Sequence, residues 1–293
     1  MKLFLRRTLQ RFIHSSTFFM NVRRTIQHHP ATAYFILTFF ISWLGAFIVV
    51  APEIIRHEPI QKIDGILMFP VMLVGPAFSG IVLTRIVDDR NGLKNLFLKM
   101  RTLKFNAKWF LALSIPPVLI LLTLFLLSFF VSHVFTPNFF ALAIAFGIPA
   151  GIFEEIGWMG FVFPKLNLKY HAFSAAAITG LFWGLWHLPV IDFLGAASPH
   201  GNFLTPYFLS FIAVMTAMRV LIVWLYSNTK SISLCQLMHI SSTGFLAMFS
   251  PSNVKASQET SWYLCYAIGL WIVVGIVVIR YGNQLVHTIA KIK

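Results

Sequence analysis

The chain has 293 residues, of which 58% are hydrophobic, 16% aromatic and only 11% charged. Soluble domains carry about 25% charged residues, so this composition excludes a soluble globular enzyme, a disordered chain and a secreted disulfide scaffold. A multipass membrane protein remains. Its net charge of +14 indicates membrane topology rather than nucleic-acid binding, because the basic residues lie between apolar segments.

The predicted elements begin with a basic amphipathic N-terminal segment, 1–30, which is expected to lie on a membrane surface. Each of the apolar runs that follow is long enough to cross a bilayer. They are 31–52, 66–87, 108–133, 138–163, 172–194, 203–226, 232–250 and 262–281. We therefore predict an all-α polytopic membrane helix bundle of about eight transmembrane helices, forming a single domain over 31–284 with a cytoplasmic tail, 285–293.

The distribution of Lys and Arg predicts the orientation of this bundle. Nineteen basic residues lie in the N-terminal segment, the C-terminal segment and the alternate loops that start with 85–108, whereas three lie in the other loops. Because basic residues are enriched in cytoplasmic loops, we expect both termini in the cytoplasm. The short loops and this asymmetry suit a bacterial plasma membrane.

Two adjacent carboxylates, Glu154 and Glu155, lie deep inside the run 138–163. A charged side chain at a helix centre costs about 2.5–3.5 kcal/mol on insertion scales, so an intramembrane ionisable residue indicates a functional site. The alternative is a structural ion pair between helices. Since neighbours on a helix point about 100° apart, we expect the two carboxylates to face different partners.

Two histidines lie in other apolar runs. His187 follows Trp183 by four residues, and His239 begins a polar stripe that continues with Ser242 and Thr243 on the same helix face. Each of these features alone is typical of a packed histidine or of a hydroxyl-rich helix seam. Together with the carboxylates, however, they form a set of polar groups on three separate spans.

Arg219 is the only basic residue deep in a span. It needs a carboxylate or a set of carbonyl groups as its partner, and Glu155 is a candidate. The alternative is that Arg219 extends its side chain toward the inner surface.

These residues allow two kinds of hydrolytic chemistry. A Glu and a His could share a water, with the Glu acting as base, while the second His and a hydroxyl donate to an oxyanion. Alternatively, Glu154, His187 and His239 could bind Zn²⁺ and leave one position for water. The spacing across different helices does not decide between them.

Three stretches carry a resemblance to a known family. Glu154-Glu155-Ile-Gly-Trp-Met, Trp183-Gly-Leu-Trp-His187 and His239-Ile-Ser-Ser-Thr243 resemble, in order and separation, the motifs EExxxR, FxxxH and HxxxN of the CPBP intramembrane proteases. This family comprises CAAX proteases and bacteriocin-processing proteins. The resemblance covers about residues 135–250 and implies a membrane endopeptidase that acts on a peptide or membrane-protein substrate within the bilayer.

The resemblance also implies roles for the residues. Glu154 and His187 would activate the water, and His239 with the polar residue at the end of its motif would stabilise the oxyanion. Glu155 becomes a supporting carboxylate. The remaining supporting residues are Ser242, Thr243, Trp183 and Arg219. A metalloprotease label is often attached to the family, so Zn²⁺ on the Glu154, His187 and His239 set stays open.

Three positions depart from the family motifs. Met159 stands in place of the motif-one arginine, and we hypothesise that Arg219 replaces that arginine from another span. Trp183 replaces a phenylalanine, which is a mild aromatic exchange. Thr243 replaces an asparagine and can still donate one hydrogen bond.

Two further functions stay open at this point. The departures at Met159 and Thr243 would suit a non-catalytic membrane scaffold or bacteriocin-tolerance protein. A proton- or ion-coupled transporter could use the buried charges as a relay, although no internal repeat is present. Because Glu154 and His239 both lie nearer the inner basic loops in sequence, we expect the cavity of an enzyme to face the cytoplasm.

Overall fold

The computed structural model describes residues 20–102, 105–194 and 200–286, and this part of the chain is helical without any strand. Residues 20–28 of the predicted amphipathic segment are helical. The rest of that segment, 1–19, and the end of the predicted tail, 287–293, lie outside the described residues. The predicted all-α bundle is therefore confirmed for the residues that the structure describes.

Seven described helical segments are long and apolar enough to span a membrane. They include α2 (Pro30–Arg56), α3 (Lys62–Val87), 3₁₀-helix η1 (Ala107–Ser114) continuing into α5 (Ile115–Phe130), and the segment Ala141–Asn167, followed by α11 (Leu204–Thr229), α12 (Ile232–Phe249) and α13 (Ala256–Tyr281). The predicted span 172–194 is divided into α9 (Ala172–Trp186) and α10 (Leu188–Leu194), which meet at His187. Its first part is a shorter apolar helix of the same bundle.

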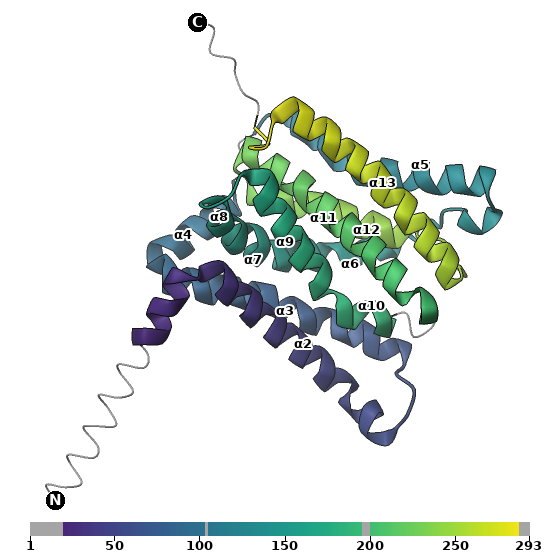
Figure 1. Cartoon of the computed structure of the whole chain (residues 1–293), viewed down its shortest axis with the longest axis horizontal. Coiled ribbons are helices and arrows are strands. Elements are labelled where there is room, and N and C mark those ends of the chain that lie inside the picture. The colour runs from purple at the N-terminus through teal and green to yellow at the C-terminus, as the bar shows by residue number, and fades with distance from the viewer. Residues whose placement is uncertain (1–19, 103–104, 195–199, 287–293) are drawn as a thin grey trace, which may run out of the picture.

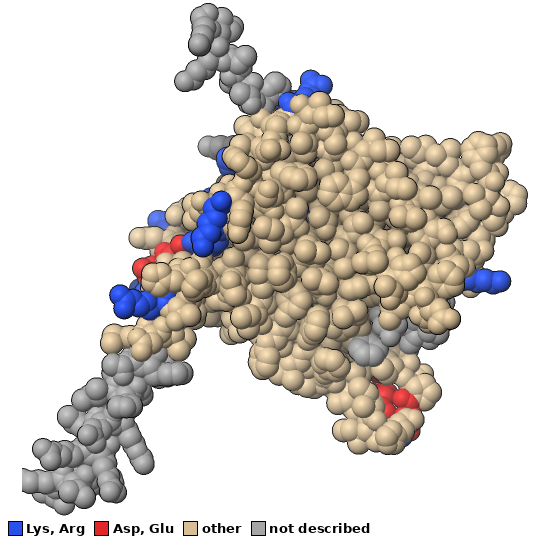
Figure 2. Space-filling view, in the orientation of Figure 1, with Lys and Arg blue, Asp and Glu red and all other residues tan. Residues whose placement is uncertain are grey.

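Charged side chains and apolar side chains occupy different parts of the surface. In Figure 2, Lys and Arg gather at the end of the bundle where α4 (Asp89–Lys99) and α8 (Phe163–Asn167) lie, and a broad band without charge crosses the visible face. Large apolar side chains outside this end are exposed, as at Ile36, Phe129 and Ile279. Exposed apolar surface on this scale fits contact with lipid rather than water.

Helix α11 is the most deeply enclosed of the seven spans and lies between α9 and α13 (Figure 1). Close approach of α9 depends on Gly180, since a Cβ at this position would lie 2.7 Å from Cα of Thr216. Small residues at such crossings let backbones approach within a membrane. The contact brings the side chains of Trp183 and Arg219 together in the core.

The segment that carries the two glutamates is not a regular α-helix. It runs through α6 (Ile144–Pro149), the π-helical turn η4 (Ala150–Glu154), α7 (Glu155–Gly157) and a second π-helical turn, η5 (Trp158–Val162), into α8. Single π turns inside helices are frequent at functional sites. The segment packs between α3 and α12.

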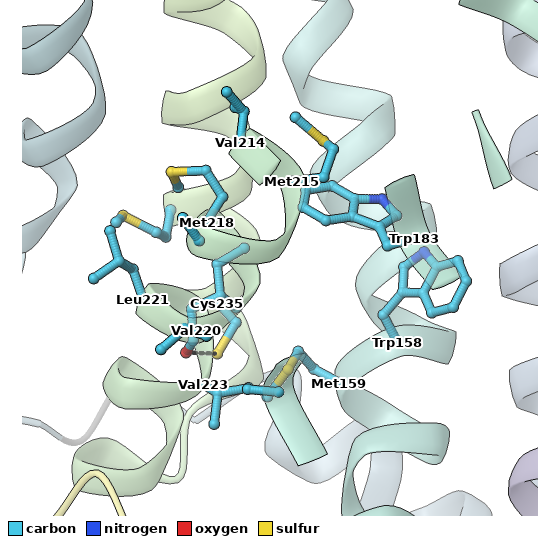
Figure 3. Close-up of a cluster of buried hydrophobic side chains, with 14 of the residues drawn as sticks. Trp158, Met159, Trp183, Val214, Met215, Met218, Val220, Leu221, Val223 and Cys235 are labelled. Atoms are coloured by element: carbon cyan, nitrogen blue, oxygen red, sulfur yellow. Dashed lines mark hydrogen bonds between the residues drawn. The ribbon is translucent and has the colours of Figure 1, made fainter. Parts of the chain in front are cut away.

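A cluster of buried apolar side chains packs beside the segment that carries the two glutamates. Figure 3 shows Trp158 and Trp183 side by side, with Met215 of α11 next to Trp183. Cys235 donates a weak hydrogen bond from Sγ to the Ile222 carbonyl at 3.7 Å. Both cysteines of the chain are free, so they contribute packing rather than a disulfide.

Candidate active site

Glu154 is the last residue of the first π-helical turn, and only one of its two carboxylate oxygens accepts a hydrogen bond from the described part of the protein. Its side chain is almost completely buried, and Oε2 accepts a hydrogen bond of 2.6 Å from the indole Nε1 of Trp183. Its Oε1 lies 4.0 Å from Nε2 of His239. This separation is too long for a direct hydrogen bond but is one that a single oxygen atom can bridge.

The ring of His239 lies between the two glutamates. Its Nδ1 donates to Oε1 of Glu155 at 2.7 Å, while its Nε2 faces Glu154. The expectation that Glu154 and Glu155 face different partners is therefore wrong. An imidazole presents nitrogens on opposite edges, and the π-helical backbone at Glu154 alters the angular separation of an ideal α-helix, so both carboxylates reach one ring.

Arg219 of α11 pairs with Glu155, as the sequence suggested. Its Nη1 lies 2.9 Å from Oε1 and 2.7 Å from Oε2, and both side chains are fully buried. The guanidinium also lies 4.1 Å from the ring centre of Trp183, within the range of a cation–π contact. Met159 packs in the apolar core. Glu155 thus has a cationic partner on another helix, and the equivalence of Arg219 to the motif-one arginine stays a hypothesis.

His187 caps the C-terminal end of α9. Its Nδ1 donates to the Trp183 carbonyl at 2.8 Å, which leaves Nε2 of a neutral ring with a free lone pair. The ring also contacts Phe211 of α11 at a centroid distance of 5.2 Å. The hydrogen bond and the ring contact hold the orientation of the imidazole.

One cavity of about 550 Å³ collects most of the predicted site residues. Glu154, Trp183, His187, His239 and Thr243 all line it. Glu155 and Arg219 lie behind this wall and do not line the cavity. Ser242 is directed elsewhere, since its hydroxyl donates to the His239 carbonyl at 2.9 Å.

The cavity runs toward the end of the bundle that is opposite the basic loops. Its α11 residues Tyr207 and Phe211 precede Arg219, and its lining continues to His200 before α11 and to Asn253 after α12. The lining residues thus lie away from the basic end of the bundle, and the side of the membrane that this cavity faces stays a prediction.

The donor atoms do not form a prepared metal site in this arrangement. No group of three His, Cys, Asp or Glu side chains within the described ranges is placed to hold a metal ion. Oε2 of Glu154 and Nδ1 of both His187 and His239 already have hydrogen-bond partners. Zn²⁺ on Glu154, His187 and His239 stays a prediction.

Sequence reasoning missed two features of this site. It treated Trp183 as an aromatic exchange, although an indole, unlike a phenyl ring, carries an N–H donor, and that donor reaches Glu154. It also missed His200 and Glu259, which line the far part of the same cavity. They stand at the ends of spans, where polar residues are common, so no local motif marks them.

Comparison with known proteins agrees with this arrangement. Residues 136–245 match the sequence profile of the family described as Rce1-like, type II CAAX prenyl endopeptidase. The chain is also 26% identical over 274 residues to CAAX prenyl protease 2 of Methanococcus maripaludis, a match that covers 86% of this chain and 92% of the relative. These matches confirm the resemblance seen in the sequence: the chain is similar to Rce1-like CAAX prenyl endopeptidases, and this similarity supports a membrane endopeptidase.

Proposed function

We propose that the chain hydrolyses a peptide bond inside the membrane with a water molecule that Glu154 activates. The observation that carries this proposal is the 4.0 Å gap between Oε1 of Glu154 and Nε2 of His239, in a cavity that His187 also lines. A reacting oxygen placed in this gap would contact a base and a second polar group at once, which is the geometric requirement for assisted attack.

Glu154 serves as the base in this mechanism. Its carboxylate takes a proton from the water, and the water oxygen forms a bond to the carbonyl carbon of the substrate. The lone pair on Nε2 of His187 accepts the other water hydrogen and orients the nucleophile. When the C–N bond breaks, the proton held by Glu154 passes to the leaving nitrogen, so the products are a carboxylate and an amine.

His239 and Thr243 stabilise the negative charge on the carbonyl oxygen. Because Nδ1 of His239 donates to Glu155, the ring offers a second N–H at Nε2 only as an imidazolium. The Arg219 guanidinium balances the charge of Glu155, so the carboxylate behind His239 is not an uncompensated ion.

A lipid-modified peptide is the substrate class that we favour. The methanogen relative is called a prenyl protease, and a second, almost wholly apolar cavity of about 440 Å³ lies between α3 and the glutamate-bearing segment. Its lining includes Leu73, Val74 and Phe153, of which Val74 and Phe153 are exposed on the apolar surface. A hydrocarbon chain could enter it from the bilayer. We place the chain in a bacterial plasma membrane because of its short loops and basic asymmetry.

Released peptides and new protein termini in membranes test this proposal. Cells expressing the wild type are compared with cells expressing Glu154→Gln at matched levels, with Glu58→Gln as the control because Glu58 is exposed and outside the cavity. We expect cleavages that occur with the wild type and Glu58→Gln but disappear with Glu154→Gln. Cleavage that exceeds the background of cells lacking the chain and persists in Glu154→Gln would overturn the role of Glu154. Profiles of all three strains that match this background would favour a scaffold.

A further inference from the structure

A second polar cluster lies in the cavity at the end away from Glu154. Nε2 of His200 donates to Oε2 of Glu259 at 3.1 Å, and the His200 ring stacks on Tyr207 with centroids 3.9 Å apart. Tyr263 packs edge-on against Tyr207 at 5.0 Å. All four residues line the cavity, and they come from α11, α13 and the residue just before η7 (Gly201–Phe203).

Glu259 is the more accessible of the two titratable partners in the His200–Glu259 pair. Its side chain is 24% exposed, whereas that of His200 is 3% exposed. Within the described residues no Lys or Arg forms an ion pair with Glu259. The Nδ1 atom of His200 is buried and has no hydrogen-bond partner in that part of the chain. The cluster thus holds a carboxylate that is oriented by a histidine and has capacity for a further donor.

The charged residues that line the whole cavity also favour binding of a cation. Its lining contains the carboxylates of Glu154 and Glu259 but, among the described residues, no Lys or Arg. Tyr207, Phe211 and Tyr263 form an aromatic wall beside Glu259. A carboxylate next to aromatic rings is a favourable environment for an ammonium or guanidinium group. Apolar surroundings strengthen such a contact because they reduce screening.

We propose that His200, Tyr207, Glu259 and Tyr263 form a subsite for a cationic group of the peptide substrate, and this inference rests on the proteolytic function proposed above. The cation is an alkylammonium or guanidinium, carried by a Lys or Arg side chain or by a free N-terminus. Tyr207 precedes Phe211, which contacts His187, by four residues and Arg219 by twelve. These are rises of about 6 and 18 Å along α11, so an extended peptide would place this group about two to five residues from the cleaved bond.

Binding measurements in the Glu154→Gln background test the subsite without requiring turnover. The probes are fluorescent, acetylated decapeptides in which Lys, norleucine or Glu is placed at each position in turn, and matched peptides with a free N-terminus. Binding is measured in lipid nanodiscs for Glu154→Gln alone and for double variants that add Glu259→Gln, Glu259→Asp or Glu58→Gln. The Glu58 change is the matched control, since it removes a carboxylate outside the cavity.

We expect Lys peptides to bind about 10-fold more tightly than norleucine peptides at one position, a ratio worth about 1.4 kcal/mol. Glu259→Gln should abolish this ratio, whereas Glu259→Asp should keep part of it and Glu58→Gln all of it. A preference for the free N-terminus over internal Lys would identify the amine as the cation. A Lys ratio that survives Glu259→Gln, or the absence of any cation preference before that change, would overturn the subsite. Neither result depends on Glu154, whose role is judged by cleavage alone.

Discussion

The indole Nε1 of Trp183 donates a 2.6 Å hydrogen bond to Oε2 of Glu154, and the same ring lies over the Arg219 guanidinium. One side chain on α9 therefore touches both buried carboxylate systems, Glu154 directly and Glu155 through its arginine. The hydrogen bond turns Glu154 so that its other oxygen faces His239. Trp183 is thus a positioning residue for the proposed base.

Replacing Trp183 by Phe should lower catalysis without lowering substrate affinity. The change removes the only donor that the structure gives to Glu154 within the described residues, and hydrogen bonds to charged groups contribute about 1.5–3 kcal/mol. We expect kcat to fall about 10- to 100-fold, by the same range, with KM nearly constant. Steady-state kinetics on a cleaved peptide measure both constants.

Trp186→Phe is the matched control for this experiment. Trp186 is also buried and lies on the same helix, but its Nε1 has no hydrogen-bond partner in the described structure. Its substitution removes the same side-chain volume but no hydrogen bond to a carboxylate, so kcat should stay within about twofold. Equal losses in both variants would mean that Trp183 acts through packing rather than through its N–H group.

The pairing of Glu155 with Arg219 predicts a separation between stability and activity. Removing one partner of a buried ion pair costs about 3–5 kcal/mol because an uncompensated charge remains. Glu155→Arg and Arg219→Glu should therefore each lower the thermal unfolding temperature strongly. The double charge reversal should recover part of that loss but no activity, because His239 also needs the carboxylate of Glu155.

The control is the same reversal at the exposed pair of Arg85 and Asp89, whose closest atoms are 3.3 Å apart. Exposed ion pairs contribute about 0–1 kcal/mol, so neither the single nor the double reversal should shift the unfolding temperature much. If the Glu155 and Arg219 double variant unfolds as readily as its worse single variant, direct pairing is refuted. Unfolding in detergent followed by tryptophan fluorescence provides the measurement.

The hydroxyls of Thr243 and Ser242 should differ in importance although they are neighbours. Thr243 lines the cavity beside His239, whereas the Ser242 hydroxyl is engaged with a backbone carbonyl. Loss of one oxyanion donor typically reduces kcat by about 100-fold or more, and we expect a loss of this order for Thr243→Val. Ser242→Ala should retain most activity, and Thr243→Asn should restore a donor. Equal activity of Thr243→Val and wild type would remove Thr243 from the oxyanion site.

Gly157 should tolerate no side chain. A Cβ at this position would clash with the Tyr34 hydroxyl and with the Pro76 carbonyl, which are both packed against the glutamate-bearing segment. Overpacking of this kind costs about 1–3 kcal/mol, and the displaced segment carries Glu154. We expect Gly157→Ala to lower both the unfolding temperature and the specific activity.

Gly275→Ala provides the comparison, since a Cβ added there meets no heavy atom within 4 Å. It lies inside α13, where Ala is favoured over Gly by about 1 kcal/mol. This variant should be as stable as the wild type or more stable, with unchanged activity. Destabilisation of both glycine variants to the same extent would mean that helix propensity, rather than the close approach at Gly157, decides the outcome.

Sequence alone determined the class of the protein and predicted the candidate residues of its site. Apolar runs matched to bilayer thickness led to a helix bundle, because an unsatisfied backbone group in lipid is too costly for most other structures. The same cost of polar groups in an apolar medium made Glu154, His187 and His239 stand out on separate spans. Charge balance led to the pairing of Arg219 with Glu155, which the structure contains.

Only the tertiary structure decided how these groups face one another. The shared contact of both glutamates with His239, the donor role of Trp183 and the direction of the cavity depend on the rotation and closeness of helices that are far apart in sequence. The π-helical turn η4 shifts Glu154 away from its ideal α-helical angle. The close contact of α9 with α11 at Gly180 brings the Trp183 ring to Arg219. His200 and Glu259 join the cavity for the same reason: 59 residues separate them along the chain, and packing alone brings them together.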